Sequence, residues 1–173
     1  VNMSTYKFTG TANFTAVIEN INFTFAVASA SVFNQYSINF IWNNCSITQS
    51  GAGDLIIANN STQYAKFEKC LITLGNVAFL DQTPKTIFSN CEIVGGGSSC
   101  YLGDEVWIDN CRFSGTFSYI TGFFLTNLQL LTSIPVLVKN GSFSNIQNLL
   151  GNVYPLNTTT FLAVSNSTFL SIT

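Results

Sequence analysis

Apolar and polar residues alternate in seven short segments of the chain that share one motif. Within each segment the alternation runs up to an Asn, or once a Lys, slips there by one residue, and then resumes. The segments are residues 16–23, 40–47, 65–72, 86–93, 106–113, 136–143 and 162–169. Alternation with a period of two is typical of a β-strand. Each segment therefore predicts two short strands separated by a bend.

The bend residue is Asn in six of the seven segments, and Asn tolerates the left-handed backbone conformation better than other residues with a β-carbon. The bend positions are Asn20, Asn44, Lys69, Asn90, Asn110, Asn140 and Asn166. They recur about every 20 to 30 residues, a period that indicates a solenoid with one coil per repeat. Stacked coils align two apolar columns, which contain Ile18, Trp42, Phe67, Phe88, Ile108, Val138 and Val164, and Phe23, Ile47, Ile72, Ile93, Phe113, Phe143 and Phe169.

A third strand is needed to close each coil, and we expect it between successive motifs. The candidates are residues 6–8, 32–36, 55–57, 77–79, 100–102, 123–125 and 149–153. The pattern predicts one all-β domain over residues 1–173, with about seven coils, both ends uncapped, and an insertion at about 114–135 between the fifth and sixth coils.

This arrangement resembles the right-handed parallel β-helix family, the pectate-lyase-like solenoids. The resemblance rests on the Asn bend positions and on a column of small residues formed by Cys45, Cys70, Cys91 and Cys111. It implies that an Asn ladder lines the tight turn between the second and third strands of each coil. The family includes lyases, hydrolases, phage spikes, adhesins and spacers, so the resemblance specifies a fold and says little about chemistry.

Composition narrows the classes of partner. Charged residues make up 8% of the chain and hydrophobic residues 47%, with a formal net charge of −2. The sequence has no basic patch, which argues against nucleic acid because phosphate binding needs clustered Lys or Arg. The most apolar stretch, residues 120–137, is interrupted by polar residues and Pro, so no membrane span is predicted.

N-glycosylation sequons are about twice as frequent as chance predicts for this composition. Nine are present, at Asn2, Asn13, Asn22, Asn44, Asn59, Asn60, Asn140, Asn157 and Asn166. The excess predicts covalent N-glycans and an extracellular or cell-surface location, because a chain with so few charges needs another source of solubility. The alternative is that a β-solenoid rich in Asn, Ser and Thr produces sequons as a by-product.

The five cysteines are expected to be packing residues, with no disulfide. Four of them share one inward column, where in-register parallel neighbours point the same way, a poor geometry for disulfides. A linear thiol ladder without histidine also makes no tetrahedral zinc site, and we expect no metal and no cofactor. Cys100 is predicted to lie on a different strand. Free thiols usually indicate a reducing compartment, and deep burial would reconcile them with secretion.

Catalytic candidates are few because the chain has no histidine, which removes Ser-His-Asp and Cys-His sites. The best cluster is Asp104, Glu105, Asp109 and Arg112, which a sugar-cleaving or calcium-binding β-helix could use. The stacking register offers another explanation, since it aligns Glu92 with Arg112 and Asp109 with Lys139 as opposite charges on adjacent coils. We favour structural pairing. Trp107 lies between two inward positions and is expected to face outward, against a loop, a glycan or a partner.

Open solenoid ends present unpaired backbone groups to other strands. We therefore expect an extracellular, glycosylated structural protein that assembles head to tail with itself into a filament or surface fibre. A piece of a longer solenoid would explain open ends equally well. The alternatives are a polysaccharide-binding or polysaccharide-cleaving β-helix, which could contact carbohydrate or a cell surface, and an adhesin or viral fibre segment.

Overall fold

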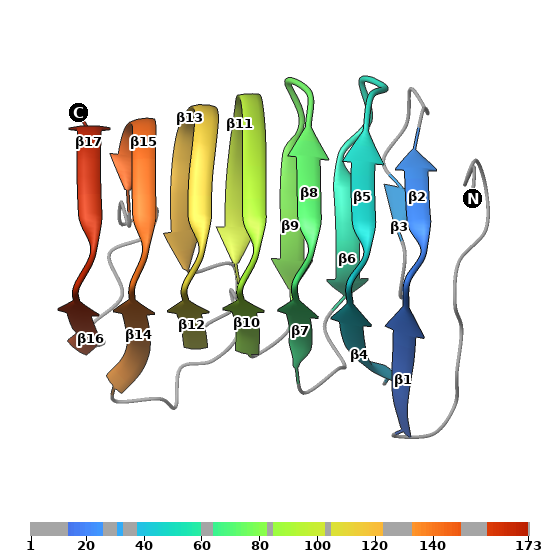
Figure 1. The fold of residues 1–173 in the computed structure, drawn as a ribbon, viewed down its shortest axis with the longest axis horizontal. Coiled ribbons are helices and arrows are strands. Elements are labelled where there is room, and N and C mark those ends of the chain that lie inside the picture. The colour runs from blue at the N-terminus through green and yellow to red at the C-terminus, as the bar shows by residue number, and fades with distance from the viewer. Residues whose placement is uncertain are drawn as a thin grey trace.

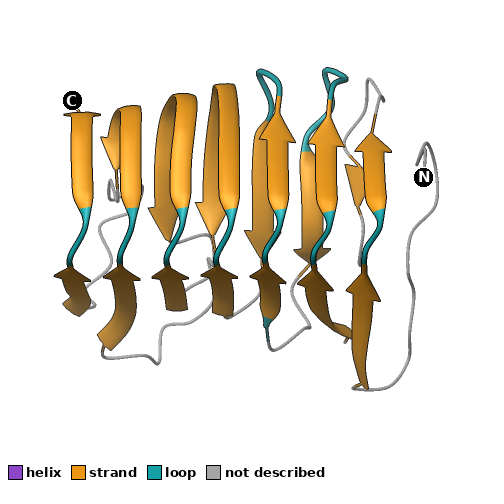
Figure 2. Cartoon of the chain, viewed as in Figure 1, coloured by secondary structure: helices purple, strands orange, loops and turns teal. Residues whose placement is uncertain are grey.

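The chain forms an all-β parallel solenoid, as the sequence predicts. The computed structural model describes residues 14–25, 31–32, 38–59, 64–82, 85–102, 105–122, 133–149 and 159–172. Strands are the regular elements throughout this part of the chain, and they follow one another as successive coils along one axis (Figures 1 and 2). Within these residues no helix is long and apolar enough to cross a membrane.

One sheet takes a single strand from each of the seven motifs. Its order is β1-β4-β7-β10-β12-β14-β16, and every neighbouring pair is parallel. These strands form the lower row in Figure 1. Their bounds are β1 (Phe14–Glu19), β4 (Ile38–Asn43), β7 (Ala65–Glu68), β10 (Lys85–Ser89), β12 (Glu105–Asp109), β14 (Ser133–Lys139) and β16 (Thr159–Ser165).

The second sheet begins directly after the bend of each coil and extends around the next corner. Its main path is β2 (Asn22–Phe25), β5 (Ser46–Gln49), β8 (Leu71–Leu74), β11 (Glu92–Leu102), β13 (Arg112–Gly122), β15 (Ser142–Leu149) and β17 (Thr168–Ile172). Three shorter strands, β3 (Ser31–Val32), β6 (Leu55–Asn59) and β9 (Ala78–Gln82), close the early coils. Strand β3 pairs with β6, β6 pairs with β9, and β9 pairs with the second half of β11. The long strand β11 thus spans two sides of its coil.

The two predicted apolar columns are confirmed by the register. Ile18 aligns with Trp42 and then Phe67 in the first sheet, and Phe23 aligns with Ile47 and then Ile72 in the second. The central members are fully buried. Neighbouring rings stack, as Phe67 and Phe88 do with their centroids 5.0 Å apart, and Phe113 and Phe143 likewise at 5.0 Å. The core is therefore one continuous aromatic and aliphatic stack along the solenoid axis.

All seven bend residues adopt the left-handed conformation. Their φ values lie between 46° and 59°, and Lys69, the one residue of the set that is not Asn, has φ 54°. Backbone hydrogen bonds continue through the bends from coil to coil. The N–H of Asn20 donates to the carbonyl oxygen of Asn43 (3.0 Å), and the N–H of Ser46 donates to that of Ile21 (3.1 Å). The bend thus turns the chain while parallel pairing continues.

The third strands predicted at residues 55–57, 77–79 and 100–102 agree with the structure wholly or in part, whereas those predicted farther along the chain, and residues 33–36, lie almost entirely outside the described residues. Residues 55–57 lie within β6 and residues 100–102 within β11, whereas 77–79 and 32–36 overlap β9 and β3 only in part. In the fifth coil β13 continues to Gly122, so residues 114–122 of the predicted insertion form a paired strand of the coil. In the sixth coil β15 ends at Leu149, where the third strand was expected to begin. Residues 6–8, 123–132 and 150–153 lie outside the described residues.

A glycine explains how β13 turns a corner without losing its pairing. Gly115 has φ 85°, a conformation that side chains with a β-carbon rarely adopt. A β-carbon added there would overlap the carbonyl oxygen of Gly95 on the neighbouring coil. The corresponding corners of β15 and β17 are at Asn145 (φ 56°) and Ser171 (φ 54°).

Candidate functional site

The predicted acidic cluster does not converge on one point. Glu105 and Asp109 are both on β12 with side chains at least partly exposed, whereas Arg112 is on β13, beyond the bend. Asp104 lies outside the described residues. Four residues of extended chain separate the Cα atoms of Glu105 and Asp109 by about 13 Å. Carboxylates that cleave glycosides lie about 5 to 9.5 Å apart, so these side chains would have to lean toward each other, whereas Glu105 is paired with Lys85.

Each charged group of this cluster that the structure describes has a structural partner. Glu105 forms an ion pair with Lys85 (Oε1–Nζ 2.8 Å), and Arg112 lies 3.9 Å from Glu92 across the coils, as the register predicts. Asp109 and Lys139 are register partners. The Oδ1 of Asp109 nevertheless accepts a hydrogen bond from the Asn140 amide (3.2 Å). The predicted charge alignment is thus present, with an amide contact at Asp109.

The cysteine column is a buried hydrogen-bonded stack. All five cysteines are free and buried. The N–H of Cys70 donates to the sulfur of Cys91, and the N–H of Cys91 to that of Cys111, both at 3.4 Å. The thiol of Cys91 donates in turn to the carbonyl oxygen of Phe67 on the preceding coil (3.4 Å). Among the residues that the structure describes, no group of three or more His, Cys, Asp or Glu could hold a metal ion.

The thiols of Cys91 and Cys100 are held in the protonated form, whereas the pKa of the Cys111 thiol is shifted the other way. The hydrogen bond with Cys111 and burial raise the pKa of Cys91 to about 12, and burial alone raises the pKa of Cys100 to about 12. The hydrogen bond with Cys91 lowers the pKa of Cys111. Cys91 and Cys100 stay protonated at neutral pH, and a protonated thiol is a poor nucleophile.

Four of the nine sequons lie in the described part of the solenoid with a placed side chain. Asn22 is exposed on β2, Asn44 and Asn166 are exposed at bends, and Asn140 is half-buried. The bend amides form hydrogen-bonded pairs, with Asn44 Nδ2 donating to Asn20 Oδ1 (2.7 Å) and Asn166 to Asn140 (2.7 Å). Asn59 belongs to β6, and Asn2, Asn13, Asn60 and Asn157 lie outside the described residues. Asn22 is thus exposed and lies away from the bend amides.

The outer face of the first sheet has an apolar stripe that the sequence analysis recognised only at Trp107. Each of its residues directly precedes an inward residue of the motif, as Trp107 precedes Ile108. Comparing this position across the seven motifs would have revealed the stripe from the sequence. Trp107 and Val17 are 41% and 56% exposed, and the remaining members are partly buried. In register order the stripe, here called the outer column, consists of Val17, Ile41, Lys66, Ile87, Trp107, Leu137 and Ala163.

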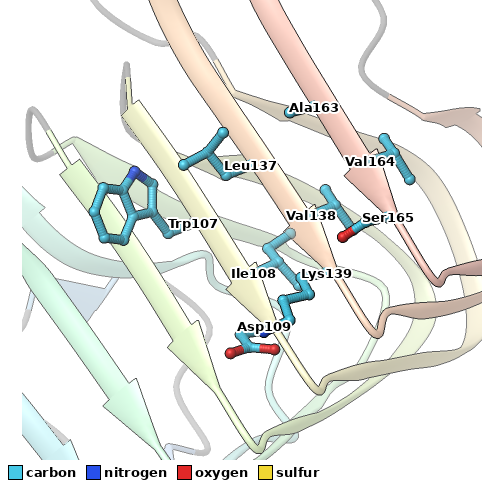
Figure 3. Close-up of a pocket in the computed structure, with 9 residues that line it drawn as sticks. All are labelled: Trp107, Ile108, Asp109, Leu137, Val138, Lys139, Ala163, Val164 and Ser165. Atoms are coloured by element: carbon cyan, nitrogen blue, oxygen red, sulfur yellow. The ribbon is translucent and has the colours of Figure 1, made fainter.

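A pocket of about 280 Å³ hollows this face over β12, β14 and β16 (Figure 3). Three consecutive residues of each strand line it: Trp107, Ile108 and Asp109, then Leu137, Val138 and Lys139, then Ala163, Val164 and Ser165. Lys85 lies beside it, with its Nζ 3.5 Å from the centroid of the Trp107 ring. The pocket therefore combines an indole and aliphatic groups with one row of polar side chains.

The two ends of the described solenoid differ in burial. At the β1/β2 end the inward residues Ile18 and Phe23 are buried. At the β16/β17 end Val164 and Phe169, which belong to the same inward columns, are each 43% exposed. Inward apolar side chains are therefore open to solvent at the β16/β17 end.

Comparison with known proteins finds no matching family model and no match among curated proteins or solved structures. The likeness to pectate-lyase-like solenoids accordingly extends to the parallel β-solenoid fold alone.

Proposed function

We propose that this chain is an extracellular, glycosylated structural protein whose solenoid is extended by a further coil stacked on β16 and β17. The exposure of Val164 and Phe169 carries this proposal. In the central coils the equivalent side chains Phe67, Phe88 and Phe113 are almost completely buried because a coil covers them on each side. The β16/β17 end thus presents the surface that a further coil would cover.

Stacking a coil there would be favourable through burial and backbone pairing. Full burial of a Val or Phe side chain contributes about 1.5 to 3 kcal/mol, and Val164 and Phe169 retain 43% of their exposure. Their further burial would therefore contribute about 1 kcal/mol each. The strands β16 and β17 each stand at the edge of their sheet, where backbone donors and acceptors can pair with another strand.

In the head-to-tail arrangement, β1 and β2 of the next copy would lie against β16 and β17. Such a contact joins two different surfaces, so it does not close on itself and leads to a filament. Ile18 and Phe23 are already buried in the single chain, so docking exchanges existing contacts for new ones at that end. The stabilisation then comes chiefly from the open end.

N-glycans fit the same arrangement. Asn22 projects from the outer side of β2, and Asn44 lies at the bend before β5. Glycans at these two positions would extend sideways from the axis. Asn166 lies between β16 and β17 and its amide donates to Asn140, so the end contact requires this sequon to be unmodified. Glycans would also give a sparsely charged protein the solubility that an extracellular location requires.

Negative-stain electron microscopy and sedimentation velocity test the end contact, on protein from a eukaryotic secretory host with and without enzymatic deglycosylation. We expect filaments with an axial repeat of about 34 Å, seven coils at about 4.8 Å each, and a mass loss on deglycosylation. Phe169→Lys and, independently, Val164→Lys should abolish the filaments because each places a charge on the stacking surface.

Leu170→Lys is the matched control, since it adds the same charge to the outward side of β17. It should leave the filaments intact, and circular dichroism should show that all three variants keep their β-structure. Native protein that stays in discrete particles at every concentration, or that loses its filaments equally with Leu170→Lys, would contradict the proposal.

A further inference from the structure

We infer that the outer column is an interface between two copies of this chain, packed face to face with their solenoid axes antiparallel. The two-fold axis of this dimer runs parallel to the strands and passes over Ile87 on β10. This contact uses a side of the solenoid, whereas the proposed filament uses its end. The two contacts are independent and can be tested separately.

The outer column is apolar where a solvated sheet face should be polar. Six of its seven residues are apolar, and Lys66 is the exception. The corresponding column on the outer face of the second sheet is mostly polar: Thr24, Thr48 and Thr73 align on successive coils, and only Val94 and Leu170 farther along are apolar. A contiguous apolar stripe on one face only is typical of a protein–protein contact.

The two-fold rotation about Ile87 sets each residue of the column against a chemically suitable residue of the partner's column. Ile87 is the fourth of seven, Lys66 precedes it by one coil, and Trp107 follows it by one coil. Reversal about Ile87 therefore sets Lys66 of each copy against the partner's Trp107. The Trp107 ring already accepts an ammonium group, because Lys85 Nζ lies 3.5 Å from its centroid. A second ammonium at this ring would form another cation–π contact, which strengthens on desolvation.

The parallel alternative is less favourable. If the two axes ran in the same direction with coils in register, Lys66 would face the partner's Lys66, and like charges repel. In the antiparallel arrangement the carboxylates of Glu68 and the partner's Asp109 share a row. Lys66 bonds Glu68 at 2.9 Å, and this hydrogen bond lowers the pKa of Glu68. That carboxylate thus brings its own counter-charge to the interface.

The shape of the face follows the same two-fold relation. The pocket of about 280 Å³ lies over β12, β14 and β16 (Figure 3). Reversal about Ile87 brings β7, β4 and β1 of the partner over these three strands, in that order. The side chains that would enter are those of Lys66, Ile41 and Val17, of which Val17 is 56% exposed. Projecting side chains in one half of the column thus face the hollow in the other half.

The face is large enough for a dimer. Seven strands at about 4.8 Å and about five residues at 3.3 Å give a rectangle of about 34 by 16 Å. Its planar area is about 540 Å², and side-chain relief increases the accessible area toward the roughly 800 Å² that each partner buries in a standard interface.

The test uses the full chain with Phe169→Lys as background, so that end stacking does not contribute to assembly. Sedimentation equilibrium should show a monomer–dimer equilibrium. Ile87→Lys should weaken dimerisation at least tenfold, because it brings two ammonium groups together at the two-fold axis. Thr73→Lys, on the outer face of the second sheet, is the matched control and should leave the dissociation constant within twofold.

An exchange of residues tests the antiparallel register. Trp107→Lys alone should weaken the dimer, since it opposes two lysines at both symmetric positions. Combining it with Lys66→Trp should restore dimerisation, because each lysine again faces an indole. Parallel packing would also allow this rescue, because the exchange removes the Lys66 pair, so Trp107→Glu separates the two arrangements. In the antiparallel dimer each glutamate would face the partner's Lys66 and the dimer should persist, whereas in parallel packing two glutamates would face each other and weaken it.

Three results would overturn the inference: a background protein that is monomeric at all concentrations, equal weakening by Thr73→Lys, and failure of the exchange to restore the dimer. A titration of the protein with cellohexaose, followed by tryptophan fluorescence, tests the outer column for carbohydrate binding. A saturable emission change in monomeric protein that Trp107→Phe abolishes would identify the outer column as a carbohydrate site instead. Native protein that forms dimers but never filaments would contradict the proposed end contact alone.

Discussion

Single bend residues decide how the coils are joined at the edge of the solenoid. Asn44, Asn110 and Asn166 each donate an amide hydrogen bond to the Asn of the preceding coil, at 2.7 to 2.8 Å. Lys69 interrupts this ladder while it adopts the same left-handed conformation (φ 54°). Next to this gap, the Asn90 amide donates to the hydroxyl of Ser89 (3.1 Å). Lys69 therefore occupies a strained backbone position without the amide that its equivalents supply.

Lys69→Asn should stabilise the protein by about 1 kcal/mol. Asn accommodates the left-handed conformation more readily than Lys, and a new amide could bond both Asn44 and Asn90, each bond contributing about 0.5 to 1.5 kcal/mol. Urea unfolding monitored by circular dichroism measures the change. Lys69→Ala is the control, because it removes the charge without supplying an amide, and it should bring no gain. Equal stability of the two variants would show that the ladder is energetically neutral at this coil.

Cys100 makes the folded state sensitive to alkaline pH. Its pKa is raised to about 12 by burial, whereas an exposed thiol titrates near 8.5. Below about pH 8.5 the thiol is protonated in both states, so its burial stabilises the fold fully. Above this pH the unfolded thiol loses its proton while the folded one keeps it, and the free energy of unfolding falls by up to about 1.4 kcal/mol per pH unit.

Urea unfolding at intervals from about pH 8 to about pH 11 should show this loss of stability. Cys100→Ala removes one titrating group and should reduce the slope by the contribution of one proton, while Cys91, whose pKa is also raised to about 12, retains its share. Its stability at neutral pH should be lower because of the cavity. Identical slopes for the native protein and the variant would mean that other groups cause the alkaline sensitivity.

Alternation along the sequence was sufficient to predict which residues of each motif are inward. It could not predict the partner of each exposed amide. Asn140 donates to Asp109 rather than to Asn110, a choice between acceptors on the same neighbouring coil that depends on side-chain rotamers. The outer column was also accessible in principle, since its members alternate with the inward ones. In the sequence only Trp107, its one aromatic residue, stands out. The register aligns the coils and so shows that the whole column is apolar apart from Lys66.

At the scale of strands, corners distinguish the early coils from the later ones. In the early coils separate strands such as β8 and β9 follow each other around the corner, whereas β11 and β13 each run through it as one paired element. The sequence signal for these corners is weak, because Gly97, Gly115, Asn145 and Ser171 differ in type. Alternation therefore did not reveal that residues 114–122 belong to the paired strand β13, and the third strands expected at 123–125 and 149–153 lie, apart from Leu149, outside the described residues.

Gly115→Ala should destabilise the protein by about 3 kcal/mol or more, since the new methyl group would collide with the Gly95 carbonyl in an unfavourable backbone conformation. Gly75→Ala is the matched control. Its β-carbon would lie 3.5 Å from the carbonyl oxygen of Gln49, an ordinary contact. Thermal and urea unfolding of the two variants measure the difference. A small effect of Gly115→Ala would mean that the corner between β11 and β13 can move apart.

At the scale of the whole molecule, the solenoid exposes inward side chains at β16 and β17 and carries an apolar outer column, and the two proposed assemblies use one feature each. End stacking lengthens the structure without limit, while the two-fold side contact closes after two copies. Together they would give a filament of paired antiparallel solenoids. The variants at Phe169 and Ile87 separate the two levels, because each removes one contact and leaves the other. Sequence alone could suggest the open end, but not the burial of Ile18 and Phe23 at the opposite end.

The bend ladder also has a direction. Every amide bond between its asparagines runs from the later coil to the earlier one, so the group dipoles add along the axis and the carbonyl oxygen of Asn166 lies at the acceptor terminus. A second copy that presented its own β16/β17 end would place one side-chain oxygen against another. A copy that presented its β1/β2 end would instead offer the amide hydrogens of its Asn20. The ladder therefore gives the solenoid axis a chemical polarity: if copies stack end to end, it would favour growth in which every copy points the same way, as in polar cytoskeletal polymers.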